Sequence, residues 1–282
     1  MKMTFAWIGG PTWVLDVEGL RIGCDPSLTP AGIVQNFGWF RSKRLTDPIY
    51  TSSTFDRIAV WLITHGHADH LDEPGLRQIR KDAIVLTHPS ASSRLRRAAC
   101  HPNSMKWGER FCLQDLTPRQ DVVSDLGSIG VTVEAIPAVH GERPWAAWAA
   151  GGVNGYWLSL RGRQGETSVY VTGDTVLHPK LIRALEGRRV DLLLANVGAA
   201  RRGGWTGTLS LSATMLARLI QMVRPAVTIP VHFGTFEHYV EPLRALEDLR
   251  DPTIRILHRG HAHEIILTSL TVEDGDASRG SP

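Results

Sequence analysis

The strongest constraint in this chain is a short stretch with three histidines and an aspartate in six residues, His65-Gly66-His67-Ala68-Asp69-His70. It directly follows an apolar run over 58–63 that is rich in β-branched and aromatic residues, which predicts a buried strand. The histidines therefore lie where a strand ends and a loop begins. This is where α/β folds place their functional groups.

The spacing within this stretch favours metal binding over a polar loop that is rich in histidine by chance. His65 and His67 are two positions apart, so on an extended backbone their side chains point to the same side and can bind one ion. Asp69 and His70 come where we expect the chain to turn, and the turn would direct them toward a second ion. Neutral imidazole together with carboxylate suits zinc, iron, manganese or nickel.

This pattern, His-x-His-x-Asp-His after an apolar strand, resembles the signature of the metallo-β-lactamase superfamily. The resemblance implies an α/β (α+β) fold, a four-layer αββα sandwich, and in most members a hydrolase with one or two metal ions. We expect residues 1–270 to form a single domain of this fold and residues 271–282 to form a flexible C-terminal tail.

Three later strand ends match the same superfamily pattern. His140 follows a predicted strand over 131–137, Asp174 follows one over 168–171, and His232 follows one over 226–231. By resemblance, one ion is bound by His65, His67 and His140, the other by Asp69, His70 and His232, and Asp174 bridges them. Asp69 and Asp174 are then the catalytic carboxylates of a site with two divalent ions. We expect zinc, with manganese or iron as alternatives.

The remaining periodicity predicts elements that surround this site. We expect strands over 5–8, 12–17, 20–24, 83–87, 155–160, 191–195, 254–257 and 264–268, and helices over 73–80, 90–99, 179–186 and 210–223. Ser210 is the expected N-cap of the last helix. Asp25, at the end of the 20–24 strand, has two interpretations: it supports a metal-binding histidine, or it is a plain turn residue before Pro26.

Composition limits the class of protein. The formal net charge of +3 in 282 residues includes no long basic block, so we expect no nucleic-acid partner. The three cysteines have no regular spacing, which predicts reduced thiols rather than a disulfide framework. No stretch has the roughly eighteen unbroken apolar residues of a membrane span, and the N-terminus does not resemble a signal peptide, so we expect a cytoplasmic protein.

Residues for substrate binding are predicted with less support from the sequence. Trp145, Trp148 and Trp205 are candidates for the wall of an apolar pocket, and Arg201 and Arg202 for contacts with an anionic group on a small-molecule substrate. The alternatives are tryptophans that cover the core and a solvated arginine pair on a glycine-rich loop. The long segment 27–57 is either a loop over the active site or a surface excursion with anchoring aromatics.

Other histidines carry weaker signals. His178 and His238 come shortly after Asp174 and His232, and either is a candidate proton donor or substrate contact. His258, His261 and His263 lie near the C-terminal strand, where we expect exposed loop histidines rather than a further metal site.

Three functions remain open from the sequence. The first is hydrolysis of a lactone or related carbonyl ester by a metal-activated hydroxide. The second is hydrolysis of a phosphodiester or phosphate ester. Motifs such as Gly-Asp-Thr and Pro-Val-His-Phe-Gly-Thr-Phe resemble those of the ascorbate-phosphate lactonase-like group and of the N-acyl phosphatidylethanolamine phospholipase D type. The third is a non-catalytic metal-binding sensor or scaffold, which the intact ligand set disfavours. The sequence predicts no oligomeric state.

Overall fold

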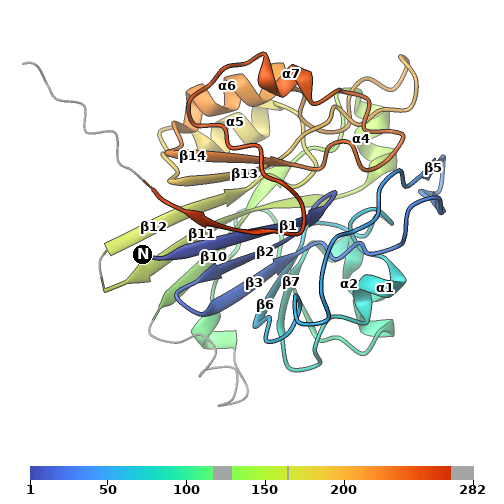
Figure 1. Cartoon of the computed structure of the whole chain (residues 1–282). Helices are drawn as coiled ribbons and strands as arrows, with labels where there is room; N and C mark the ends of the chain where they lie inside the picture. The colour runs from blue at the N-terminus through green and yellow to red at the C-terminus, as the bar shows by residue number, and fades with distance from the viewer. Residues whose placement is uncertain (117–128, 164, 268–282) are drawn as a thin grey trace, which may run out of the picture.

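Two facing β-sheets form the centre of the protein in a computed structural model that describes residues 1–116, 129–163 and 165–267 (Figure 1). The first sheet has the order β15-β1-β2-β3-β6-β7-β8. Its strands are β1 (Met3–Gly9), β2 (Thr12–Val17), β3 (Leu20–Cys24), β6 (Val60–Ile63), β7 (Ile84–Thr87), β8 (Pro102–Ser104) and β15 (Ala262–Ile265). The strands from β3 to β8 run parallel, whereas β15, β1, β2 and β3 pair antiparallel.

The second sheet has the order β14-β13-β12-β11-β10-β9. Its strands are β9 (Arg110–Cys112), β10 (Gly130–Ala138), β11 (Val153–Gly162), β12 (Gly165–Val171), β13 (Leu192–Asn196) and β14 (Val227–Val231). Pairing is antiparallel from β9 to β12 and parallel from β12 to β14. The parallel strands β6, β7, β13 and β14 are short, fully buried and mostly apolar, which is the pattern expected where both faces of a sheet are covered.

Alternation along the strands divides the core into two layers. In β6, Val60 and Leu62 belong to the large apolar cluster between the sheets, while Trp61 and Ile63 belong to a second cluster under the helices of the first sheet. Each face of the strand therefore supports a different layer, and the loop that follows β6 is held from both sides.

Helices cover the outer face of each sheet (Figure 1). The helices α1 (Glu73–Leu76) and α2 (Pro89–Arg97) lie outside the first sheet, and α5 (Pro179–Leu185), α6 (Ala213–Val223) and α7 (Arg244–Glu247) lie outside the second. These four layers confirm the predicted αββα sandwich. In the described part of the chain, no helix reaches the length and apolar character that a membrane crossing demands.

Several short elements were not predicted from the sequence: one helix and a two-stranded hairpin near the site, and β8, β9, α7 and a 3-10 helix over Leu113–Leu116 elsewhere. Helix α4 (Pro144–Ala150) begins with Pro144 in its first turn and ends before Gly151, at φ 82°, which is a helix signature visible in the sequence. The short strands β4 (Val34–Asn36) and β5 (Arg41–Lys43) form a hairpin within the 27–57 segment, and that hairpin is too short and irregular to give a period.

The helices expected over 90–99 and 179–186 are α2 and α5, with bounds that differ by at most two residues, whereas the other two predicted helices differ more. The helix expected over 73–80 is a single turn, α1, because Gly75 lowers helix propensity and packs so closely on Pro26 that a Cβ would lie 1.8 Å from the Pro26 carbonyl oxygen. The helix expected from Ser210 begins at Ala213, and its N-cap is Ser212, whose side chain accepts a hydrogen bond from the Met215 amide. The Ser210 hydroxyl instead accepts a hydrogen bond from the Ala200 amide.

The strand expected over 254–257 is wrong. Only Ile254 forms a bridge there, to Thr228 in β14. The next ladder bond on that edge would have to come from the amide of Pro230, and proline has none. The strand expected over 264–268 is β15, which begins earlier, at Ala262, and ends at Ile265. Thr268 and the predicted tail over 271–282 lie outside the described residues.

We expect Ser212→Ala to lower the free energy of unfolding by about 1 kcal/mol, because the variant leaves an amide in the first turn of α6 without its acceptor. Urea unfolding measures this change. The matched control is Ser93→Ala, the same substitution at an exposed position inside α2, which should leave stability unchanged or slightly raised. Equal effects of the two substitutions would contradict the assigned cap.

Candidate metal centre

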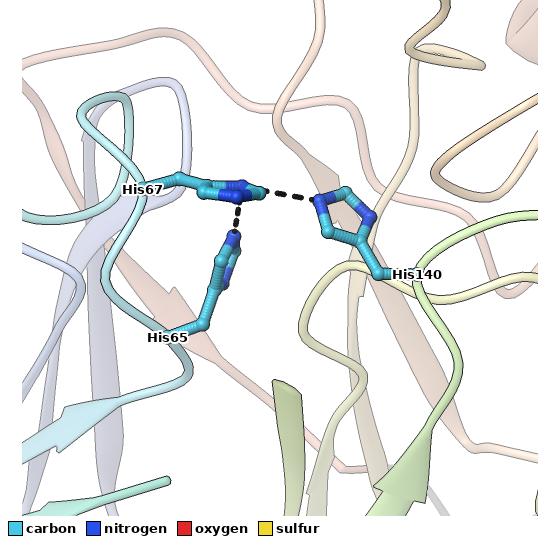
Figure 2. Close-up of side chains that lie close together, drawn as sticks. All are labelled: His65, His67 and His140. Carbon is cyan, nitrogen blue, oxygen red and sulfur yellow. Dashed lines mark hydrogen bonds between the residues drawn. The ribbon is translucent and has the colours of Figure 1, made fainter. Parts of the chain in front are cut away.

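The histidines predicted to bind the first ion converge on one point. His65 and His67 come from the loop after β6, and His140 comes from the loop after β10, at the facing edge of the other sheet (Figure 2). His67 Nδ1 lies 2.9 Å from His65 Nε2 and 3.3 Å from His140 Nε2. Nitrogens that bind one tetrahedral zinc ion lie about 3.3 Å apart. All three rings therefore have a nitrogen at the spacing of a shared ligand.

The second predicted group is assembled from the same loop and the end of β14. His70 Nε2 and His232 Nε2 lie 3.2 Å apart. Asp69 Oδ2 lies 3.8 Å from His232 Nε2. Its other oxygen, Oδ1, is buried and has no hydrogen-bond partner among the described residues. An unpaired buried carboxylate oxygen is costly, so it fits a position that faces a cation.

Asp174 lies between the two groups. Its Oδ1 is 3.3 Å from His232 Nε2 and 3.4 Å from His70 Nε2, and its Oδ2 is 3.8 Å from His140 Nε2. Oδ1 also accepts a hydrogen bond from Asn196 at the end of β13. Gly173 makes this position possible, because it has a φ of 58° and a Cβ there would lie 2.6 Å from the Asn154 carbonyl oxygen. The two oxygens of Asp174 therefore face different groups, as a bridging ligand requires.

Hydrogen bonds fix the tautomers of the rings. His140 Nδ1–H donates to the Leu209 carbonyl at 2.7 Å, and His232 Nδ1–H donates to the Val197 carbonyl at 3.0 Å. In each ring this leaves Nε2 unprotonated and directed at the centre. His65 Nδ1–H donates to the Thr64 hydroxyl at 3.0 Å, with the same result. The ligand atoms are thus prepared for a cation, and without one their lone pairs would face each other.

Asp25 has the first of its two predicted roles. Its carboxylate accepts bonds from the Thr64 amide, the Thr64 hydroxyl and His70 Nδ1, at 2.7, 2.6 and 2.7 Å. All these groups are buried. Asp25 therefore orients a predicted ligand and connects the end of β3 to the loop after β6.

Burial and neighbouring charges set the protonation of the two groups differently. Burial lowers the pKa of His65 well below 6.5, with the neighbouring His70 and His67 adding to the effect. Burial, with His140, lowers the pKa of His67 to about 3. Burial also acts to lower the pKa of His70, but Asp174, Asp69 and Asp25 outweigh it and raise that pKa well above 6.5. The first group is therefore neutral near pH 7, whereas His70 carries a proton that a cation would displace.

Two further side chains contact Asp69 and were not predicted in that role. The Tyr239 hydroxyl donates to Asp69 Oδ2 at 2.8 Å, and His238 Nε2 lies 3.2 Å from the same oxygen. Burial, with Asp69 and Asp174, raises the pKa of Tyr239 well above 10, so its phenol stays protonated and donates. His238 was a candidate from its proximity to His232 in sequence, but no signal in the sequence pointed to Tyr239 or to Asn196.

Of the other residues predicted to bind substrate, some lie near the metal centre and the rest lie in a separate cleft or on the surface. His238 lines the pocket over the ligands, and Trp145 and Trp205 stack on each other, with ring centroids 5.0 Å apart. Arg201 lines a separate cleft with Glu142 and Arg143, whereas Arg202 and Trp148 are exposed to solvent. His178 caps α5, and its ring accepts a hydrogen bond from the Lys180 amide.

The C-terminal histidines do not join a metal group in the described residues. His261 and His263 have ring centroids 6.5 Å apart, and His263 Nε2 bonds the His258 carbonyl. The described ligand groups all belong to the centre between the sheets: His65, His67 and His140; His65, His70 and Asp174; and Asp69, His70 and His232.

Comparison with known proteins agrees with this geometry. The profile of the β-lactamase superfamily domain matches residues 21–233. A UPF0173 metal-dependent hydrolase from Carboxydothermus hydrogenoformans is 27% identical over 84% of this chain and 86% of its own length. A possible metal-dependent hydrolase from Veillonella parvula has a TM-score of 0.75 at 18% identity, covering 93% of this chain and 99% of that one. An isothiocyanate hydrolase from Delia radicum gut bacteria has a TM-score of 0.73 at 18% identity, covering 92% and 98%.

The chain therefore belongs to the metallo-β-lactamase superfamily, as one of its metal-dependent hydrolases with His and Asp metal-binding groups. This confirms the superfamily that the sequence resembles and the class of activity that the resemblance implies.

We expect Asp174→Ala to reduce the bound metal from about two ions per chain to one or fewer and to abolish turnover, because the carboxylate faces both groups. Elemental analysis of protein purified without chelator, with a thermal melt to check folding, measures both effects. The control is Asp56→Ala, at an exposed aspartate. A wild-type protein that holds no metal even after addition of zinc, manganese or iron would contradict the assigned centre.

Metal binding by the second group should strengthen as pH rises from 6 to 8, because binding must displace the proton of His70, whose pKa is raised. Binding by the first group should vary little over that range, since the pKa values of His65 and His67 are lowered. Calorimetric titration of metal-free protein with zinc, in buffers of different ionisation enthalpy, counts the released protons. Two binding steps with the same dependence on pH would be the contrary result.

Proposed function

We propose that this protein hydrolyses an uncharged carbonyl compound, a lactone or related ester, with two divalent ions, zinc in the first instance. The proposal depends on the pocket onto which the ligand groups open. Its lining combines His67, Asp69, His140, Asp174 and His238 with aromatic and apolar side chains. The described side chains that line it include no lysine or arginine.

The hairpin of β4 and β5 supplies one wall of this pocket. Phe37 and Phe40 stack with ring centroids 4.6 Å apart, and Phe37 also contacts His67 and His238 edge-on. Trp39 lines the pocket next to them. We infer that the 27–57 segment covers the active site, and that its aromatic wall favours an uncharged substrate over a phosphate ester.

When bound, the metal ions would supply an activated water and a Lewis acid for the carbonyl oxygen. The chain's own residues hold these groups in place. Tyr239 and His238 bond one oxygen of Asp69 and leave the other, which is buried and has no partner among the described residues, to bind a cation. Asn196 donates to one oxygen of Asp174 and so fixes the orientation of that carboxylate.

We assign the proton transfer to His238. In ester hydrolysis the water oxygen forms a bond to the carbonyl carbon, the bond from that carbon to the leaving oxygen breaks, and one water proton passes to the leaving oxygen. His238 faces the pocket, with Nδ1 2.8 Å from the Ser42 hydroxyl and Nε2 3.2 Å from Asp69 Oδ2. During turnover Nε2 would exchange its contact with Asp69 for one with the leaving oxygen and deliver that proton there.

Hydrolysis of a phosphate ester is the second candidate. Arg201 and Arg143 line a cleft of about 470 Å³ beside the metal pocket. The two spaces are adjacent because Ala200 and Leu209 line the pocket, and their chain neighbours Arg201 and Thr208 line the cleft. A substrate with a distant anionic group could place it there. The resemblance to the N-acyl phosphatidylethanolamine phospholipase D type also favours a phosphodiester.

We expect metal-loaded protein to hydrolyse p-nitrophenyl acetate and simple lactones with a kcat/KM at least about tenfold above that for bis(p-nitrophenyl) phosphate. The reason is the apolar lining without cationic side chains. Steady-state rates measure the ratio, and p-nitrophenyl acetate and bis(p-nitrophenyl) phosphate share a leaving group. The control is Asp174→Ala, which should lose all of these activities together.

Faster turnover of the phosphodiester would contradict the carbonyl proposal and favour the second candidate. Arg201→Ala tests whether the substrate carries an anionic group in the cleft, away from the bond that reacts. It should raise KM for a phosphorylated lactone and leave the uncharged lactone unchanged, if the cleft binds an anionic group.

A further inference from the structure

Three tryptophans from distant segments meet at the rim of the metal pocket. Trp39 comes from the turn between β4 and β5, Trp145 from the first turn of α4, and Trp205 from the loop between β13 and α6. Trp145 and Trp205 stack in parallel, with ring planes 7° apart, and Trp39 meets both edge-on at 6.2 and 6.3 Å. We call these three residues the tryptophan cluster.

The tryptophan cluster is continuous with the metal pocket. Trp39 lines the pocket and packs on the small apolar cluster that contains Ala146, Ala200 and Leu209. Leu209 in turn holds the ring of His140 through its carbonyl. A molecule that extends from the ligand groups past Trp39 would therefore lie beside Trp145 and Trp205, whose rings contact Trp39.

The space above the ligand groups is too small for a whole substrate. It measures about 10 Å³, which is room for one water-sized group. Only the reacting bond fits there, so the rest of the substrate has to extend outward over the rim. The rim is apolar, with Trp145 42% exposed and Trp205 63% exposed.

We propose that the tryptophan cluster is a substrate subsite that binds a flat apolar group, an aromatic ring in the first instance, attached to the carbonyl carbon. The proposal rests on the proposed hydrolysis of carbonyl compounds. Exposed indole faces gain from burial against another ring, in offset-stacked or edge-on contact. The parallel pair presents an outer face for stacking, and Trp39 presents a second ring close to the pocket.

Trp148 provides a matched control. It lies on the same helix as Trp145, three residues later, and is 85% exposed. Among the described residues its ring does not contact the tryptophan cluster, and it does not line the metal pocket. An effect common to all exposed tryptophans would appear at Trp148, whereas an effect of the subsite would not.

The test compares Trp205→Ala and Trp148→Ala on p-nitrophenyl phenylacetate and p-nitrophenyl acetate, which share a leaving group. We expect Trp205→Ala to lower kcat/KM for the phenylacetyl ester about tenfold, mainly through KM, and to change it less than about twofold for the acetyl ester. Trp148→Ala should change neither, and Trp205→Phe should restore most of the loss. Equal losses on both esters, or no loss on either, would overturn the subsite.

A second measurement does not depend on turnover. Binding of phenylacetamide, an uncharged probe, to metal-loaded protein is followed by ligand-observed NMR. We expect Trp205→Ala to lose binding and Trp148→Ala to keep it, even if no ester is hydrolysed, in which case the proposed function alone fails. The subsite would be overturned if both variants bind the probe equally well, or if the wild type does not bind it at all.

Discussion

The carboxylate of Asp25 is the interaction on which the rest of the centre depends. It lies at the end of β3 in a left-handed backbone conformation, with a φ of 40°, and is completely buried. Three hydrogen bonds from Thr64 and His70 end on it. They fix the loop after β6 to its neighbouring strand and fix the tautomer of His70. A buried carboxylate with this many donors is also costly to replace, because its partners would be left unpaired.

The opposite sheet completes the centre by the same means. His140 and His232 donate to backbone carbonyls at Leu209 and Val197, and Asn196 donates to Asp174. All the ligands follow strand ends, so the rigid sheets determine their positions and the short hydrogen bonds determine which ring nitrogen faces inward. The protein thereby gathers imidazoles and carboxylates whose buried ligand atoms suit a bound cation.

In this architecture, the residues that bind metal and the residues that contact substrate come from different parts of the chain. Metal-binding side chains come from the ends of strands, whereas the walls of the pocket come from the β4–β5 hairpin, α4 and the loop after β13. Loops can change their aromatic residues without moving the strands. A substrate preference set by Trp39, Trp145 and Trp205 is therefore compatible with a metal centre shared across a superfamily.

The sequence by itself determined the sandwich and the residues that gather at its edge. Buried strands such as Val60–Ile63 have a strong local pattern, and each polar ligand follows the end of one of them, so the strands and the ligand positions follow from short-range signals, while the sandwich follows from the resemblance that these motifs carry. Helix limits were less well determined: Ser212 rather than Ser210 caps α6, and Pro230 stops a strand expected at 254–257. Only the tertiary structure brought Tyr239 to Asp69, Asp25 to His70, and three tryptophans from separate loops to one rim. These contacts join residues far apart in the chain through side chains on irregular backbone, where no period links sequence to position.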